Sequence, residues 1–168
     1  IPSIDAVYVV PFTETEIEFQ GNEKPWTELL DYSANTTIFA QLPFDHPLYI
    51  LYSSGTTGLP KSIVHGAGGC LLKHLTEHRY HSDINPGDRV FYFTTCGWMM
   101  WNWLVSSLAS GATIILYDGA PTFPDAGRMW KLIDEQQITH FGTSPKFLGA
   151  VNKAGYSPRK NNQLHSLK

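Results

Sequence analysis

Short apolar runs alternate with segments of helical periodicity along most of the chain. Runs rich in β-branched and aromatic residues predict strands over residues 6–10, 48–52, 62–65, 89–95, 113–117 and 138–142. Apolar residues at helical spacing predict helices over residues 70–81, 98–110, 128–136 and 146–153. Strands separated by helices of this length are typical of βαβ units. The pattern therefore predicts an α/β fold with a mainly parallel sheet, flanking helices and ligands at the carboxyl ends of strands.

The same pattern divides the chain near residue 45. Residues 1–45 predict one strand, stopped by Pro11, and then a polar connecting segment. Residues 46–168 carry the regular alternation and form the expected α/β core fragment. The first residue is not methionine, and residues 161–168 predict no closing element. We therefore expect the chain to be a piece of a longer polypeptide.

Composition and charge exclude several classes of protein. The 168 residues are 42% hydrophobic, which is ordinary for a globular domain. Twelve basic and fifteen acidic residues give a net charge of −3, so neither nucleic acid nor an anionic membrane is an expected partner. The two cysteines have neither disulfide-framework nor zinc-site spacing, and there is no signal peptide or apolar run of membrane length. The expected location is cytoplasmic, with no metal bound by the chain itself.

A dense run of hydroxyl groups and glycines joins the second and third predicted strands. Its candidate phosphate-binding residues are Ser53, Ser54, Gly55, Thr56, Thr57, Gly58 and Lys61. Glycines allow the backbone to fold tightly, so that several N–H groups point at phosphate oxygens. The hydroxyls donate further hydrogen bonds, and the lysine supplies a positive charge. The run therefore predicts a loop that binds the phosphates of a nucleotide.

The spacing of this loop distinguishes it from the common nucleotide motifs. It reads G-x-x-G-x-x-K, whereas the Walker loop requires G-x-x-x-x-G-K-[ST] directly before a helix. Pro60 stands where the second Walker glycine would be, and the dinucleotide pattern G-x-G-x-x-G is absent from the loop. A solvated turn between two strands is the structural alternative. A nucleotide-binding module without turnover is the functional one.

The loop resembles the signature of the adenylate-forming enzymes, the superfamily of acyl-CoA synthetases, peptide-synthetase adenylation domains and luciferase. Its neighbours are similar to short-chain acyl-CoA synthetases and, further on, to the branch that activates acetoacetate. The segments that carry the resemblance are residues 52–61, 46–48, 63–66, 97–103, 111–113 and 116–119. The likeness as a whole covers residues 46–148, and it implies part of the large N-terminal domain of such an enzyme. Acetate, propionate and butyrate remain alternative acids.

The resemblance implies a two-step reaction. A carboxylate attacks the α-phosphate of ATP, and coenzyme A then displaces AMP. Thr56 and Lys61 are the implied catalytic residues, because the loop would hold the departing phosphates together with Mg²⁺. The family's later acidic motif, its ribose-binding aspartate motif and its mobile C-terminal domain are not found in this sequence. We therefore expect the rest of the same polypeptide to be a partner, and the chain alone to be inactive or nearly so.

The acyl-binding residues are also implied by the resemblance. Trp98 matches a family position beside the acyl group, and Met99 and Met100 match positions that line the acyl pocket. From its residue type alone, Asn102 is a candidate to bind the 3-keto group of acetoacetate. Residues 143–144, Thr143 and Ser144, resemble the loop near the path of the acyl group and pantetheine. The structural alternatives are an ordinary buried helix over 98–110 and a plain helix N-cap at Ser144.

One motif points to a different class of enzyme. His74, Glu77 and His78 fit H-x-x-E-H, the inverted zinc-protease pattern, in which two histidines bind zinc and the glutamate acts as base. A polar helix face that carries histidines is the alternative explanation. An esterase triad has no support, since the chain has no G-x-S-x-G elbow.

Overall fold

The computed structural model describes residues 3–12, 16–30, 36–53 and 58–168. The chain divides into two compact units, Ile1–Gln41 and Leu42–Lys168. Among the described residues, every helix is too short or too polar to cross a lipid bilayer.

The described residues of the first unit form two short strands and one turn of 3-10 helix. Strand β1 (Val7–Val9) pairs in parallel with β2 (Glu23–Pro25), with Val7 opposite Glu23. The 3-10 helix η1 (Trp26–Leu29) follows β2 directly. The strand expected over residues 6–10 is confirmed. The segment that was expected to be only a connection forms β2 and η1. Strand β2 was not predicted, because the strand it pairs with lies far away in the sequence.

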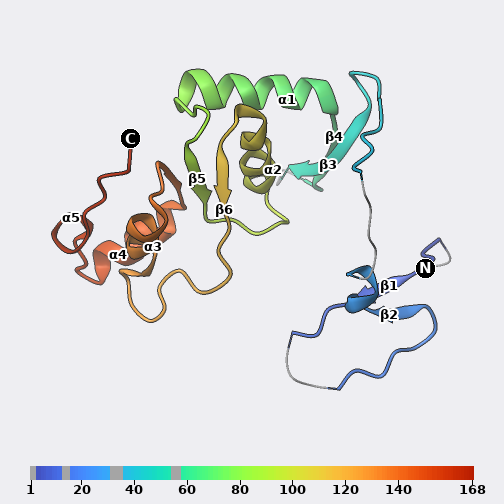
Figure 1. The fold of residues 1–168 in the computed structure, drawn as a ribbon, viewed down its shortest axis with the longest axis horizontal. Coiled ribbons are helices and arrows are strands. Elements are labelled where there is room, and N and C mark those ends of the chain that lie inside the picture. Colours follow the sequence, from blue (N-terminus) through green and yellow to red (C-terminus); the bar gives the residue numbers. More distant parts are fainter. Residues whose placement is uncertain (1–2, 13–15, 31–35, 54–57) are drawn as a thin grey trace. The chain divides into compact units, whose positions relative to one another are not determined.

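The second unit contains the remaining helices and strands of the described residues (Figure 1). In chain order they are β3 (Pro47–Ser53), β4 (Lys61–Gly66), α1 (Ala67–Thr76), the π-helix η2 (Glu77–His81), β5 (Arg89–Tyr92), α2 (Met99–Ser106), the 3-10 helix η3 (Ser107–Ser110), β6 (Thr113–Ile115), α3 (Arg128–Gln136), β7 (His140–Gly142), α4 (Pro145–Lys153) and α5 (Pro158–Asn161). The predicted strands and helices of residues 46–153 all form. Helix α5 was not predicted.

A parallel sheet with the order β6-β5-β7 forms the centre of this unit. Helix α2 and η3 connect β5 to β6, and α3 connects β6 to β7, as expected for βαβ units. Gly111 ends η3 with φ +76°, in the left-handed region that favours glycine. The predicted α/β class is confirmed here.

Alternation along β5 places two apolar cores on opposite faces of the sheet. Val90 packs with Leu104 of α2 and with Ile84, all of them buried. The next residue, Phe91, points to the other face, where Ile133 of α3 packs with it. Helix α4 adds Phe147 and Val151 to the Phe91 face. The sheet is therefore the middle layer between α2 on one side and α3 and α4 on the other.

Strands β3 and β4 form a separate antiparallel hairpin, with Ser53 opposite Lys61. This pair is antiparallel, unlike the sheet of β5, β6 and β7, since the few residues between its strands are too short a connection for a parallel crossover. The hairpin leads directly into α1, whose Gly68 packs under the Phe44 ring and donates its backbone N–H to the Phe44 carbonyl over 2.9 Å. A methyl group at Gly68 would overlap that ring. Glycine is therefore required where α1 begins.

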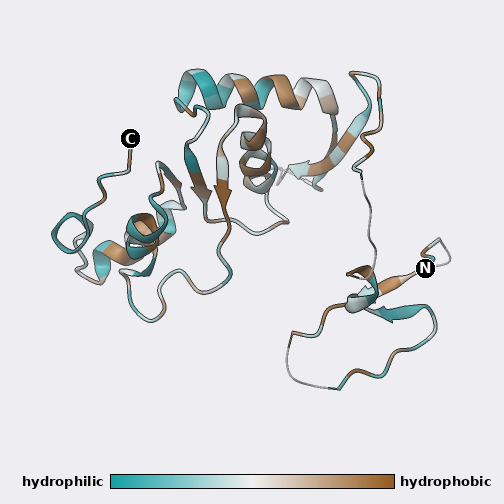
Figure 2. Ribbon diagram, viewed as in Figure 1, coloured by the Kyte–Doolittle hydropathy of each residue, from teal (hydrophilic) through white to brown (hydrophobic). Residues whose placement is uncertain are grey.

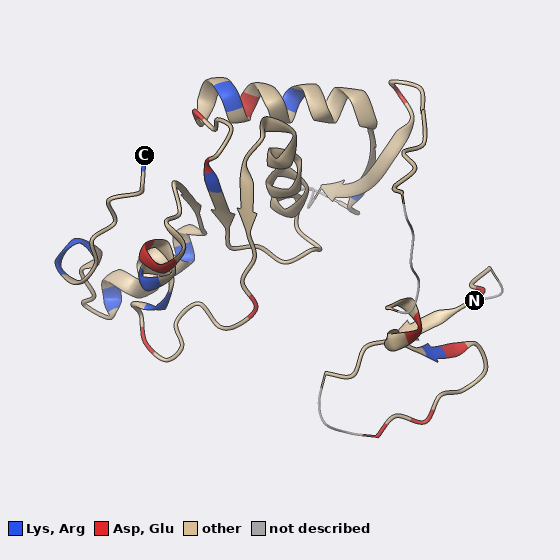
Figure 3. Ribbon diagram, viewed as in Figure 1, with Lys and Arg blue, Asp and Glu red and all other residues tan. Residues whose placement is uncertain are grey.

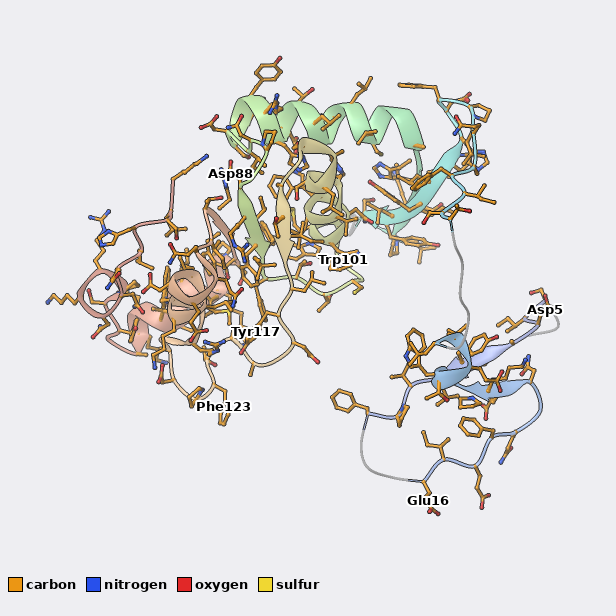
Figure 4. All side chains as sticks on the ribbon, in the orientation of Figure 1. Asp5, Glu16, Asp88, Trp101, Tyr117 and Phe123 are labelled. Carbon is orange, nitrogen blue, oxygen red and sulfur yellow. The ribbon has the colours of Figure 1, made fainter. Side chains whose placement is uncertain are left out.

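The last residues of the chain pack back onto the sheet. Lys168 Nζ lies 2.8 Å from Asp88 Oδ1 and 2.9 Å from Oδ2, beside the start of β5 (Figure 4). The backbone N–H of Asn85 donates to the same carboxylate over 2.8 Å. Burial alone would raise the pKa of Asp88, but these bonds, with Lys168 first, lower that pKa below its ordinary value.

We expect acid to weaken this contact. Because the folded pKa of Asp88 is depressed, its stabilisation is present above the unfolded pKa and is lost as the pH falls through the folded value. Replacing Lys168 with methionine should lower the free energy of unfolding by about 1 kcal/mol at pH 7, since the lysine is half exposed. The difference from the unmodified chain should shrink below about pH 4. Urea unfolding at both pH values, with Lys160→Met as control, measures it; an equal loss at both would contradict it.

Candidate nucleotide and acyl site

The described ends of the predicted phosphate loop lie at the tip of the β3–β4 hairpin. Ser53 is the half-buried last residue of β3, and Lys61 is the exposed first residue of β4, directly opposite. Gly58 is exposed, and a side chain added there would meet no other atom within 4 Å. The remaining loop residues, Ser54, Gly55, Thr56 and Thr57, lie outside the described residues. The described part of the loop therefore presents an exposed lysine and an uncrowded glycine.

The charge distribution along the hairpin favours an anion. Lys61 is the single charged side chain, counting Lys, Arg, Asp and Glu, in strands β3 and β4 (Figure 3). An anion at the tip would therefore meet a positive charge and no carboxylate from either strand. The strands themselves are apolar: Leu48 and Ile50 of β3 and Ile63 and Val64 of β4 are exposed (Figure 2).

The predicted acyl residues lie where α2 begins. Trp98 directly precedes the helix in an extended conformation, and its ring packs edge-on against Tyr92 with centroids 5.7 Å apart. Met99 is the first residue of α2 and, like Trp98, is more than 40% exposed. Met100 is partly buried. The burial expected of an ordinary core helix is therefore found at Leu104, whereas Trp98, Met99 and Leu108 are exposed. The acyl-pocket roles stay predictions.

A cavity of about 480 Å³ is lined both by residues of the hairpin and by Met99. Its wall includes Leu51 and Val64 of the hairpin, Cys70 and Lys73 of α1, and Met99. The structure thus brings Met99 beside the strands that carry the phosphate loop. The proximity fits a site in which an acid and the phosphates of ATP meet.

Asn102 faces a second, smaller cavity of about 230 Å³ between β3, α1 and α2. Trp101 of α2, labelled in Figure 4, is another wall residue of this cavity. Both cavities share Tyr49, Cys70 and His74 as wall residues. Burial, with the neighbouring Cys70 thiol, raises the pKa of Tyr49 to about 12, so its hydroxyl keeps its proton at neutral pH. In the described residues the walls of these two cavities include neither Trp98 nor Met100.

Residues Thr143 and Ser144 follow β7 at its carboxyl end. Ser144 caps α4, because its hydroxyl accepts the backbone N–H of Phe147 over 3.2 Å and Pro145 occupies the first helical position. Within the described residues, the buried Thr143 hydroxyl has no hydrogen-bond partner. The predicted N-cap explains Ser144, and a role toward substrate stays a prediction for Thr143.

Sequence reasoning missed a third cavity, of about 550 Å³, at the carboxyl ends of β5 and β6. Its polar wall comes from Thr94, Thr95 and Cys96 after β5 and from Asp118 after β6. Ligands of parallel α/β sheets bind at this edge. The sequence signal for this cavity was the polar end of the strand predicted over residues 89–95, at Thr94 and Thr95, together with Asp118 directly after the strand predicted over residues 113–117.

The residues of the zinc-like motif hold α1 and η2 against α2 and η3. His78 is fully buried, its Nε2 donates to the Trp103 carbonyl over 3.1 Å, and its Nδ1 lies 3.5 Å from the Ser110 hydroxyl. Glu77 accepts the indole N–H of Trp103 over 3.1 Å and pairs with Lys73 at 2.8 Å. No group of three metal-ligating side chains occurs in the part of the chain that the structure describes. These contacts account for the motif through packing, so the zinc hydrolase receives no support.

Comparison with known proteins identifies relatives of one kind. The family model described as "AMP-binding enzyme" matches residues 3–168. The acetoacetyl-coenzyme A synthetase of Rhizobium meliloti is 55% identical over 137 residues, which cover 82% of this chain and 21% of that protein. The malonamoyl-CoA synthetase vrtB of Penicillium aethiopicum is 51% identical over 135 residues, which cover 74% of this chain and 19% of that protein.

A solved structure supports the same relationship. The acetoacetyl-CoA synthetase from Streptomyces lividans superposes with a TM-score of 0.86 and 44% identity, over 99% of this chain and 25% of that chain. The chain thus spans about a quarter or less of the relatives it matches. The predicted fold class and the predicted resemblance to acetoacetate-activating enzymes are both confirmed. Since the family model matches nearly all of its residues, the chain belongs to the AMP-binding enzyme family.

Proposed function

We propose that the full-length polypeptide containing this chain is an acetoacetyl-CoA synthetase, which joins acetoacetate to coenzyme A at the expense of ATP. The proposal rests mainly on Lys61, which is exposed and lies opposite Ser53 where the loop rich in glycines and hydroxyl groups joins β3 to β4. The sequence identity of 55% to the Rhizobium enzyme supports acetoacetate as the acid.

The proposed reaction has two balanced steps. A carboxylate oxygen of acetoacetate forms a bond to the α-phosphorus of ATP, while the bond from that phosphorus to the bridging oxygen breaks and pyrophosphate leaves. The sulfur of coenzyme A then attacks the acyl carbon of the mixed anhydride. A thioester forms, AMP leaves with the bonding electrons, and the thiol proton passes to solvent. No oxidant or reductant is required.

In the first step, the hairpin tip would hold the β- and γ-phosphates that depart. Lys61 brings a positive charge on a flexible stem to the place where negative charge grows on the leaving group. Ser53, Ser54, Thr56 and Thr57 would each donate a hydroxyl proton, and Gly55 and Gly58 would leave the backbone N–H groups accessible. Ser53 and Lys61 are held by paired strands, so these two residues need little reorganisation as charge develops.

Mg²⁺ would arrive with the nucleotide. The loop offers hydroxyl and carbonyl oxygens, which are the ligand type that Mg²⁺ accepts alongside phosphate oxygens, so the residues present fit the ion. When bound, Mg²⁺ would neutralise charge on the triphosphate. A cytoplasmic location is proposed as well, because Cys70 and Cys96 are both free thiols.

The proposed acyl residues give a specificity prediction. Met99 and the partly buried Met100 would contact the apolar part of the acid, with Trp98 beside it, and the Asn102 amide would donate to its 3-keto oxygen. Replacing Asn102 with leucine should lower kcat/KM for acetoacetate about tenfold more than for butyrate, which has no oxygen at carbon 3. Competing-acid kinetics of the full-length polypeptide measure this ratio, with the exposed Asn152→Leu as control. An equal loss of kcat/KM with the two acids would show that Asn102 does not bind the 3-keto group.

Exchange of labelled pyrophosphate into ATP tests the proposed function. The full-length polypeptide should catalyse this exchange only when an acid is present, and acetoacetate should support it better than acetate, propionate or butyrate. A preference for one of those short acids would instead identify a short-chain acyl-CoA synthetase. ATP hydrolysis without any acid, or nucleotide binding without turnover, would contradict the proposal.

A further inference from the structure

The small cavity between β3, α1 and α2 has the form of a site for a small polar acid. Its wall is mostly apolar, with Leu48, Leu71 and Val105 among its members, and its polar groups include His74 on α1 and Asn102 on α2. At about 230 Å³ it falls below the roughly 300–1,000 Å³ of pockets for drug-sized ligands. A molecule of a few heavy atoms matches this space.

The hydrogen-bond network fixes the tautomer of His74. The Ser106 hydroxyl donates its single hydrogen to the Trp103 carbonyl over 2.9 Å. Ser106 Oγ also lies 2.8 Å from His74 Nδ1, so it must accept the hydrogen of Nδ1. Burial lowers the pKa of His74, which keeps the ring neutral near pH 7. The other ring nitrogen, Nε2, therefore carries a lone pair and acts as a hydrogen-bond acceptor.

His74 and Asn102 thus bring complementary groups to one cavity. In the described residues neither His74 Nε2 nor the Asn102 side chain makes a hydrogen bond within the protein, and both residues line the cavity. The Asn102 amide can donate to a carbonyl oxygen, and His74 Nε2 can accept an N–H. A carbonyl next to an N–H is a primary amide. The methyl ketone of acetoacetate has the same shape and the same oxygen but lacks the N–H.

We propose that His74 and Asn102 read the group at carbon 3 of the acid, and that the enzyme therefore activates the half-amide of malonic acid as well as acetoacetate. The inference rests on the proposed function and adds the second substrate and the residue that recognises it. Asn102 binds the oxygen that both acids share. His74 binds the amide nitrogen that only the half-amide has, so His74 sets the preference between the two.

The two acids are nearly identical in shape, which makes their ratio a sharp test. In pyrophosphate exchange by the full-length polypeptide, the unmodified protein should use both acids. His74→Phe should lower kcat/KM for the half-amide about tenfold relative to acetoacetate, because one hydrogen bond is lost. His74→Gln should restore much of the ratio, since its side-chain oxygen can accept the same N–H. The exposed His81→Ala is the matched control and should leave the ratio unchanged.

Each outcome decides the inference. Because the ratio is measured within one preparation, partial unfolding of a variant cancels, and His74→Leu replaces the phenylalanine variant if that protein is inactive. An unmodified protein that cannot use the half-amide, or a ratio that His74 variants leave unchanged, would overturn the role of His74. In either case exchange with acetoacetate would survive. Loss of exchange with every acid in the unmodified protein would overturn the proposed function instead.

Discussion

Replacing Lys61 with methionine should lower kcat/KM for ATP in the acid-dependent exchange by about 10²- to 10³-fold, the usual cost of removing one preorganised donor to developing charge. Lys61 is exposed at the hairpin tip and is the single cation on β3 and β4, so neither strand offers a substitute charge. Methionine keeps an unbranched side chain of similar size and removes the charge. The expected loss therefore reports charge, with little contribution from folding.

Two companion variants sharpen this test. Lys61→Arg keeps the charge but spreads it over a planar fork, so it should recover part of the rate. Lys160→Met removes an exposed lysine from α5 and should leave the rate unchanged. Steady-state kinetics of the full-length polypeptide at several ATP concentrations give all three values. A Lys61→Met variant with the rate of the Lys160→Met control would refute the phosphate-binding role.

Replacing His78 with alanine should lower the free energy of unfolding by about 3 kcal/mol. The ring is fully buried and packs edge-on against Trp103 with centroids 4.5 Å apart. Its removal leaves a cavity between η2 and α2, and it leaves the Trp103 carbonyl with one donor fewer. The cost of the cavity and the cost of the lost hydrogen bond add, since neither alanine nor bulk water can restore the buried contact.

Urea unfolding followed by tryptophan fluorescence measures this effect, because Trp103 lies against the mutated ring. His81→Ala, five residues from the end of α1 and exposed, should change stability by less than about 0.5 kcal/mol. Equal effects of the two substitutions would show that His78 does not hold the two helical segments together. A loss of stability that zinc restores would revive the metal-binding alternative.

Local periodicity was sufficient to predict most of the second unit. The apolar face of α3 and the alternation of β5 are set by adjacent residues, and Met129, Ile133, Val90 and Phe91 are indeed buried. Strand β2 escaped prediction because Glu23–Pro25 is polar, contains proline and pairs with a strand sixteen positions earlier. Only that distant partner gives the segment an extended shape, and no local pattern reports it.

The site shows the same division between local and long-range information. The phosphate loop is a continuous run of residues, so its chemistry could be predicted from sequence. The role of His74 could not, because it depends on Ser106, thirty-two residues away on another helix. In sequence, His74 is part of a zinc-like motif, and the packing of α1 against α2 gives it different neighbours. The roles of side chains whose partners lie on other helices or strands can be assigned only from the structure.

Hydrogen exchange of the full-length polypeptide tests the central claim most directly, because it reports on the loop's own backbone N–H groups. Addition of ATP with Mg²⁺ should slow exchange in a peptide that covers residues 53–61, and pyrophosphate should do the same. AMP, which lacks the β- and γ-phosphates, should protect this peptide much less. If ATP protects other parts of the protein but leaves residues 53–61 unchanged, the hairpin does not hold the triphosphate and the account is contradicted.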